Sequence, residues 1–317
     1  MAAMRRHASV LLLVLVACTS EPTATESGPA VATPSASVPI SSVVAPTPEP
    51  PPPPEASATL VAAGDIAACD RDGDSATAAL VAELDGTVAT LGDHAYPNGS
   101  DETFARCYDP AWGGFLDRTR PAVGNHDLAG DGGAAYYRYF ANRAGIPGEG
   151  WYSYDIGDWH VVVLNSNCEL ISCVAGSPQY EWLAGDLAAS VATCTLAYMH
   201  HPRFSSGPHG DYPPVAPLWE ALHAAAADVV LVGHDHLYER FAPQTPAGIA
   251  DASGIRQFTV GTGGYQLYGA ERVAPNSEVL IDDALGVLEL TLQPDSYDWR
   301  FLTIDGMAAD TGTGACH

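Results

Sequence analysis

Five apolar runs of the chain end in the same way, and this repeated ending constrains the fold more than any other feature. Each run is followed directly by a polar residue that can bind a metal ion, and in four of the five a Gly stands just before that residue. The endings are Gly64-Asp65, Gly92-Asp93, Gly124-Asn125, His200-His201 and Gly233-His234. In α/β sheets, sites form outside the carboxyl ends of strands. We therefore expect the five endings to meet at one edge of a sheet.

The rest of the globular part alternates between strand and helix patterns. Helices are predicted at 75–84 with Ser75 as N-cap, at 102–116 with an interruption at Pro110, at 177–190 with Ser177 as N-cap, and at 215–226. Strands are predicted at 59–65, 87–93, 120–127 (a short strand and loop), 194–201, 228–236 and 256–264, with hairpins at 152–167 and 285–305. The order mixes βαβ units with hairpins, which predicts an α/β fold with mixed sheets.

The first 18 residues are predicted to be a secretory signal. Two Arg precede a short apolar run that is too short to span a membrane. The run ends in LVAC, which resembles a bacterial lipobox, so we favour lipidation of Cys18. The alternative is ordinary signal cleavage with Cys18 discarded. The lipobox interpretation predicts an exported protein, anchored at the bacterial cell envelope surface or in the periplasm.

Residues 19–57 are predicted to be a disordered tether. They are rich in Pro, Ser, Thr and Ala and hold no aromatic residue. Such a composition cannot bury a core, and its prolines favour extended conformations. The globular domain is then 58–317, a size that suits one large α/β domain.

The net charge of the chain limits the kinds of molecule that it can bind. The net charge is −25, and all 13 basic residues are Arg. The sequence shows no basic patch, so we expect no nucleic-acid binding. An acidic protein that handles anions needs a local positive centre, which bound metal ions would supply.

Six cysteines remain in the domain, and none forms a CxxC pair. This excludes the zinc-ribbon and thioredoxin interpretations. An even number in an exported domain predicts three disulfides. Cys168 and Cys173 are the expected pair because they close a short local loop, and the other pairings stay open.

The residues at the strand endings offer carboxylate, amide and imidazole ligands without thiolate. This donor set suits iron, manganese or zinc. A carboxylate that bridges two ions is the usual arrangement of two-metal hydrolases.

Taken in order, the motifs GD, GDxxY, GNHD, His and GHxH resemble the calcineurin-like metallophosphoesterases. They span residues 64–240, and GHDHLYER with Tyr96 makes the purple acid phosphatase branch the best match. The resemblance implies a sandwich of two mixed β-sheets flanked by helices. It also implies a metal-dependent hydrolase that acts on phosphate esters by attack of a metal-bound hydroxide.

Carried over residue by residue, the resemblance implies two metal positions. The first would be held by Asp65, Tyr96 and His236, and the second by Asn125, His200 and His234. Asp93 would bridge the two ions. The resemblance also makes His126 and His209 candidates to bind phosphate or to protonate the leaving group.

One departure from the family pattern bears on Tyr96. Many members have Asp-x-His at the first motif, whereas this chain has Asp65-Ile66-Ala67. One imidazole is therefore missing, which favours coordination by Tyr96 over simple packing. A phenol ionises only near pH 10 in water, so it binds as phenolate to a strongly acidic ion. The expected pair is Fe(III) with Fe, Zn or Mn at the second position.

The remaining His and Asp residues are assigned no role in the chemistry. His201 is interpreted as a neighbour of a ligand, His160 and His223 as structural, and the direction of His94 cannot be read. The acidic stretch 70–74 resembles a calcium loop but lacks the later Glu, so a solvated turn is favoured.

The leading functional hypothesis is a phosphomonoesterase that resembles acid phosphatases. Two alternatives remain: a phosphodiesterase or nucleotidase that uses the same site, and a non-catalytic surface lipoprotein that binds a partner. The sequence leaves the physiological substrate and the oligomeric state open.

Overall fold

A computed structural model of the chain describes residues 57–270 and 272–317. The predicted signal, Cys18 and nearly all of the predicted tether lie outside the described residues. Within the described part, no helix is long and apolar enough to cross a membrane.

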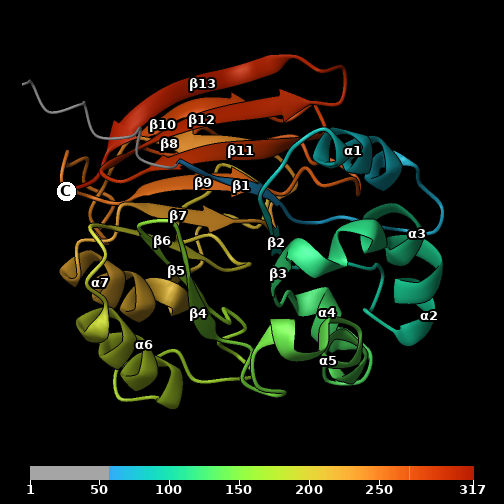
Figure 1. Cartoon of the computed structure of the whole chain (residues 1–317), viewed down its shortest axis with the longest axis horizontal. Coiled ribbons are helices and arrows are strands. Elements are labelled where there is room, and N and C mark those ends of the chain that lie inside the picture. Colours follow the sequence, from blue (N-terminus) through green and yellow to red (C-terminus); the bar gives the residue numbers. More distant parts are fainter. Residues whose placement is uncertain (1–56, 271) are drawn as a thin grey trace, which may run out of the picture. The chain divides into compact units, whose positions relative to one another are not determined.

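Two mixed sheets form the framework of this part of the chain (Figure 1). The six-stranded sheet has the order β13 (Ala308–Ala315), β12 (Ser296–Thr303), β11 (Gly286–Gln293), β1 (Ala58–Ala63), β2 (Thr87–Leu91) and β3 (Thr119–Ala122). The seven-stranded sheet has the order β10 (Ser277–Ile281), β8 (Tyr238–Phe241), β9 (Arg256–Val260), β7 (Val229–Val232), β6 (Cys194–Tyr198), β5 (Trp159–Val163) and β4 (Tyr152–Ile156).

Each sheet has a parallel part and an antiparallel part. The strands β1, β2 and β3 are parallel, and so are β5, β6, β7 and β9. The carboxyl ends of these parallel strands are the places where the sequence puts its Gly-polar endings. The predicted fold class, an α/β sandwich of two mixed sheets flanked by helices, is therefore confirmed.

Side chains alternate between two apolar layers along the parallel strands. In β5, Val161 and Val163 belong to the layer shared with the six-stranded sheet, whereas Val162 packs with helix residues such as Leu218 on the other face. This is the two-residue period expected of a strand buried on both faces. Backbone also joins the sheets directly, since Gly64 N donates to Val260 O at 2.9 Å.

The helices lie outside the sheets. Figure 1 shows α6 (Pro178–Ala189) and α7 (Ala216–Ala224) beside β4 to β7. The other helices lie beside the β1–β3 end; they are α1 (Gly73–Ala82), α2 (Asp101–Thr103), α3 (Asp109–Trp112), α4 (Asn125–Ala129) and α5 (Ala134–Phe140). Shorter turns complete the chain: a π turn at Phe104–Tyr108 and 3₁₀ turns at Gly113–Arg118, Ala141–Ala144 and Pro213–Val215.

Three local predictions were wrong. Helix α1 begins at Gly73, with Asp72 rather than Ser75 as its N-cap, and Ser75 lies inside the first turn, where its backbone N–H donates to Asp74 Oδ1. The segment 102–116 stays helical through Pro110, since the preceding turn is a π turn and Pro110 stands where a helix tolerates a missing N–H. The loop expected within 120–127 contains the start of α4, which begins at Asn125.

Three disulfides join the six cysteines of the domain, as predicted. Cys168 pairs with Cys173, which confirms the local pairing expected from the sequence. The other two pairs are Cys69–Cys107 and Cys194–Cys316. The last pair ties the start of β6 to the residue that follows β13, so it links the two sheets.

Candidate metal centre

Three strand ends turn sharply through a rare backbone conformation. Asp65, Asp93 and His234 have φ angles of 60°, 52° and 71°, in the left-handed region. Non-Gly residues seldom adopt this region, and such strained positions cluster at functional sites. The turn directs the three side chains into the space beyond the strands instead of along the sheet.

The glycines at the strand ends let the chain segments approach closely. A Cβ added to Gly124 would lie 2.1 Å from Asp93 Oδ1, and one added to Gly233 would lie 2.7 Å from Asp65 Oδ2. Any side chain there would displace a carboxylate. The strand ends can approach this closely only because the residues at the contact have no Cβ. This explains why Gly recurs in the sequence pattern.

A first donor set surrounds the hydroxyl of Tyr96. Its Oη lies 2.9 Å from Asp65 Oδ1, 3.1 Å from Asp93 Oδ2 and 3.1 Å from His236 Nε2. All four side chains are buried. Backbone bonds between Ala67 and Tyr96 fix the Tyr96 segment against the first motif, so Ala67 lies in a backbone bridge rather than at the donor cluster.

A second donor set is built around His200. Its Nε2 lies 3.0 Å from Asn125 Oδ1 and 3.2 Å from His234 Nδ1. His200 is completely buried, and its Nδ1 donates to Leu91 O at 2.7 Å, so Nε2 is the nitrogen that faces the cluster. Such a hydrogen bond to the far nitrogen is the usual way a protein orients a metal-binding His.

Asp93 belongs to both sets. Its Oδ2 lies 3.1 Å from Tyr96 Oη on one side and 3.2 Å from His200 Nε2 on the other. Its Oδ1 accepts the backbone N–H of His126 at 2.8 Å, which holds the carboxylate in place. Each set therefore contains the same carboxylate oxygen.

These side chains fit a pair of cations. Tyr96 has one hydroxyl proton but three acceptors within reach, so hydrogen bonding alone leaves the first set unsatisfied. Ligand atoms at right angles around an ion, each about 2.1 Å from it, lie about 3 Å apart, which is the spacing found in both sets. Asp93, His200 and His234 also offer ligand atoms that all lie within 4.8 Å of one another.

The pKa shifts in the cluster show that its buried carboxylates are stabilised by nearby positive charge. Burial would raise the pKa of Asp93, but His200, His126 and His234 hold that pKa far below its usual range. Asp93 in turn raises the pKa of His200 to about 9 against the effect of burial. Burial and the charge of His200 lower the pKa of His234 to about 3. The charge of His200 thus favours the ionised form of the buried Asp93 carboxylate.

Two further histidines lie at the rim. His126 donates from Nδ1 to Pro97 O at 2.6 Å, and its Nε2 lies 4.0 Å from Asp93 Oδ2. The ring of His209 lies 4.3 Å from that of His234. The imidazoles of His126 and His209 are 39% and 45% exposed, so both reach solvent beside the buried donors. The structure thus brings all nine sequence-predicted site residues to one place.

Several orienting contacts escaped the sequence analysis. The segment after β9 holds the first donor set, because Gln266 O accepts from His236 Nδ1 at 2.5 Å and the rings of Tyr265 and Tyr268 stack on Tyr96 and His236. Asp235 accepts hydrogen bonds from both the backbone N–H and Nδ1 of His209. The pattern GTGGY indicates a tight turn there but not its contacts.

Asp127 has a structural role that its place in GNHD does not disclose. Its buried carboxylate accepts the backbone N–H groups of Gly124, Asp93 and His94. It also bonds to His94 Nδ1 at 2.9 Å, while His94 Nε2 lies 2.7 Å from Thr90 Oγ1. His94 therefore points away from the donor sets, and Asp127 ties the ends of β2 and β3 together.

The remaining candidates lie outside the donor sets. His201 contacts His234 but bonds to Ser166, as a neighbour of the cluster. Within the acidic stretch 70–74, Asp70 and Asp72 are exposed whereas Asp74 is buried and bonded to backbone.

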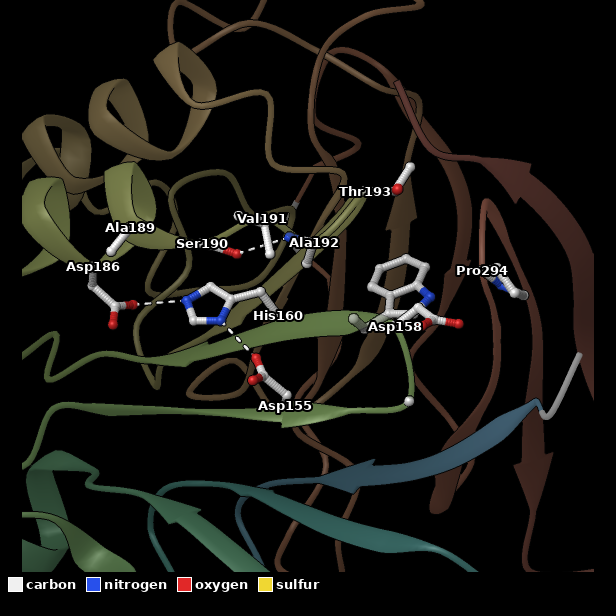
Figure 2. Close-up of a pocket in the computed structure, with 12 residues that line it drawn as sticks. Asp155, Asp158, His160, Asp186, Ala189, Ser190, Val191, Ala192, Thr193 and Pro294 are labelled. Atoms are coloured by element: carbon white, nitrogen blue, oxygen red, sulfur yellow. Dashed lines mark hydrogen bonds and ion pairs between the residues drawn. The ribbon is translucent and has the colours of Figure 1, made fainter.

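A cavity of about 660 Å³ opens at the other end of β5 and β6 (Figure 2). His160 lines it and is held between Asp155 and Asp186 at 2.9 and 2.8 Å. The two carboxylates engage opposite nitrogens of one imidazole, so their donor atoms do not converge on a common point. This arrangement supports the structural interpretation of His160.

The comparisons with known proteins agree with this geometry. Residues 54–238 match the model of the calcineurin-like phosphoesterase family, which is more than half of the chain. The chain therefore belongs to the calcineurin-like phosphoesterase family, as the motifs predicted. The family generally uses a dinuclear metal centre.

Within the family, the chain is related to purple acid phosphatases. It is 30% identical over 188 residues to purple acid phosphatase 21 of Arabidopsis thaliana, covering 52% of this chain and 42% of the relative. It is 26% identical over 182 residues to purple acid phosphatase 23 of the same plant, covering 51% and 39%. The matched parts thus span about two fifths of these relatives.

Solved structures share the fold. A purple acid phosphatase from yellow lupin (Lupinus luteus) seeds matches with a TM-score of 0.72 at 18% identity, covering 83% of this chain and 55% of that one. GAP50, the anchor in the inner membrane complex of Plasmodium, matches with a TM-score of 0.63 at 14% identity, covering 82% and 89%. At these identities the likeness establishes the fold alone.

The close approach at Gly124 generates a prediction. Gly124→Ala should lower the free energy of unfolding by about 1–3 kcal/mol, because its Cβ meets the Asp93 carboxylate. It should also weaken the binding of Mn²⁺ or Zn²⁺. Thermal unfolding and metal analysis measure the two effects.

Gly185→Ala is the matched control. Gly185 lies inside α6 with nothing within 4 Å of its added Cβ, so Ala should stabilise the helix by up to about 1 kcal/mol. A Gly124→Ala protein with the parent's stability and metal content would contradict the packing described for the centre.

Proposed function

We propose that this chain hydrolyses phosphate monoesters with two metal ions. The observation that carries the proposal is the position of Asp93 Oδ2 between the two donor sets. A carboxylate shared in this way is what a bridged pair of ions requires. The names of the related purple acid phosphatases also support it, although those matches cover only part of each relative.

Asp65, Tyr96 and His236 would hold one ion, Asn125, His200 and His234 the other, and Asp93 both. Bound there, the ions would bind and polarise the phosphate and lower the pKa of water. Tyr96 favours Fe(III) in the first set. Burial and the charges of Asp65 and Asp93 raise the pKa of Tyr96 well above its ordinary value, so only a strongly acidic ion would bind it as phenolate. Fe, Zn or Mn would suit the second set, which holds an amide oxygen and two imidazoles.

The chain's own residues would handle the substrate and the proton. His126 and His209 are the partly exposed imidazoles at the rim: His126 follows the donor Asn125 in the chain, and the ring of His209 lies 4.3 Å from that of His234. Asp235 fixes His209 through Nδ1, which leaves Nε2 for the substrate. One of these histidines would bind a phosphate oxygen, and one would give its proton to the departing alcohol oxygen.

We also propose that the chain is exported and anchored through a lipid on Cys18. The apolar run before LVAC supports this proposal. The three disulfides support it independently, because such bonds persist mainly in oxidising compartments.

Removal of Asn125 tests the second donor set. Asn125→Ala should lower kcat on p-nitrophenyl phosphate by about 100-fold or more, since loss of an outer partner of a ligand already costs roughly 10–100-fold. Thermal unfolding should show an intact fold, and metal analysis should show a weakened second ion. The control is Asn142→Ala, an exposed Asn, which should keep full turnover. Parent turnover in a folded Asn125→Ala protein would refute the assignment.

Tyr96 is tested by colour. An iron-loaded protein should absorb visible light through charge transfer from the Tyr96 phenolate to Fe(III), and Tyr96→Phe should abolish the band while iron or zinc stays in the second set. Tyr265→Phe is the matched control, because Tyr265 stacks on Tyr96 at 3.8 Å and its loss should leave the band. A band that survives Tyr96→Phe would exclude Tyr96 as a ligand.

The lipid anchor is tested by fractionation. The native protein should partition into detergent, and Cys18→Ser should move it to the soluble fraction, because a lipidated Cys18 is the only anchor proposed. A wild-type protein that is wholly soluble and cleaved at another position would rule the anchor out.

A further inference from the structure

A pocket of about 330 Å³ opens directly beside the second donor set. Asn125 and His234 of that donor set line it. Its other lining residues come from two segments. His201 and Tyr212 follow β6, whereas Asn167, Glu169 and Leu170 follow β5, the last two inside the loop that the Cys168–Cys173 disulfide closes. A substrate whose phosphate lay on the donor sets would extend into this space.

One wall of the pocket is aromatic. The ring of His201 stacks on that of Tyr212, with centroids 4.6 Å apart and an angle of 25° between the planes. His201 is buried and is held at two points, because its backbone N–H and its Nδ1 both bond to Ser166 Oγ. Leu170 is 70% exposed at the pocket. Flat, partly apolar walls of this kind suit a ring.

Two of the residues that line the pocket, Asn167 and Glu169, offer acceptor oxygens to a ligand. Asn167 is 4% exposed, and its Nδ2 donates to Asn165 Oδ1 and Val123 O. Its Oδ1 accepts no hydrogen bond from any residue in 57–270 or 272–317, which leaves this oxygen as an acceptor for a ligand. Glu169 is exposed and has no ion-pair partner among the same residues. Its charge reaches the wall, since burial and then Glu169 raise the pKa of Tyr212.

The charge of the pocket is negative. Glu169 is the one carboxylate that lines it, and no Arg lines it to offset that charge. A second phosphate placed here would be repelled by the Glu169 carboxylate, and no Arg of the lining would offset that repulsion. A neutral group that carries hydroxyl or amino donors would find acceptors instead.

From these contacts we infer that the pocket receives the alcohol part of the ester and selects a neutral ring with hydrogen-bond donors, such as a nucleoside, over a group that carries a further phosphate. The inference rests on the proposed function. Water adds to phosphorus, the bond from phosphorus to the alcohol oxygen breaks, and that oxygen takes a proton. The products are inorganic phosphate and the free alcohol.

Rates on matched substrates test the inference with the full chain. We expect the parent to show a higher kcat/KM for adenosine monophosphate than for adenosine diphosphate, whose departing group carries a phosphate into the pocket. Glu169→Gln should raise kcat/KM for the diphosphate by roughly tenfold, because a like-charge contact is lost. The gain for the monophosphate should be smaller, since its neutral nucleoside keeps an acceptor in the amide, so the preference for the monophosphate over the diphosphate should fall.

Two further variants sharpen the test. Glu169→Ala removes the acceptor as well as the charge, so it should raise KM for adenosine monophosphate several-fold and more than it raises KM for p-nitrophenyl phosphate, whose ring carries no hydrogen-bond donor. Glu102→Gln is the matched control: it removes a carboxylate from the pocket of about 530 Å³ beside Tyr96. It should not alter the preference between the two nucleotides.

An unchanged preference in Glu169→Gln, or an equal shift in Glu102→Gln, would overturn the pocket assignment. Hydrolysis of p-nitrophenyl phosphate by the parent would in that case leave the proposed function standing. A metal-loaded parent that hydrolyses none of the three substrates, the two monoesters and the diphosphate anhydride, would overturn both proposals.

Discussion

The close approach of two buried carboxylates, Asp65 and Asp93, is the constraint on which the rest of the structure depends. Both lie at ends of parallel strands of one sheet, and both are almost fully excluded from water. Burying two like charges is costly unless partners surround them. Each carboxylate therefore accepts one backbone N–H, from His234 and from His126, and keeps its other oxygen for the space between the strand ends. That space needs positive charge, which the proposed ions would provide.

The seven-stranded sheet supplies the imidazoles that face these carboxylates. His200 and His234 follow β6 and β7 of the seven-stranded sheet, and they face the carboxylates that follow β1 and β2 of the other sheet. The site exists only because the two sheets pack with their strand ends together. Glycines at the strand ends allow that approach. Asp127 joins the ends of β2 and β3 by accepting the backbone N–H groups of Asp93 and Gly124. The contacts that pack the strand ends together are thus the same ones that position the candidate metal ligands.

The sequence predicted the parts of this arrangement that depend on local pattern. Buried strands followed by Gly and a polar residue predicted which side chains meet, and the resemblance to a family predicted how they divide into two sets. The direction of His94 was not predictable, because it depends on a bond to Asp127 from another strand end. The same holds for Asp235, Tyr265 and the free acceptor of Asn167, whose partners are distant in sequence. Strands β8, β10 and β13 were missed because each is set by pairing with a neighbour.

The central claim is that Asp93 bridges two ions held by separate sets of side chains. Anomalous diffraction from crystals of the protein loaded with Mn²⁺ or with iron and zinc measures this directly. The account predicts two peaks about 3.5–4 Å apart, each within bonding distance of an Asp93 oxygen. One peak should contact Asp65, Tyr96 and His236, and the other Asn125, His200 and His234. A single peak, or two peaks of which only one contacts Asp93, would contradict the account.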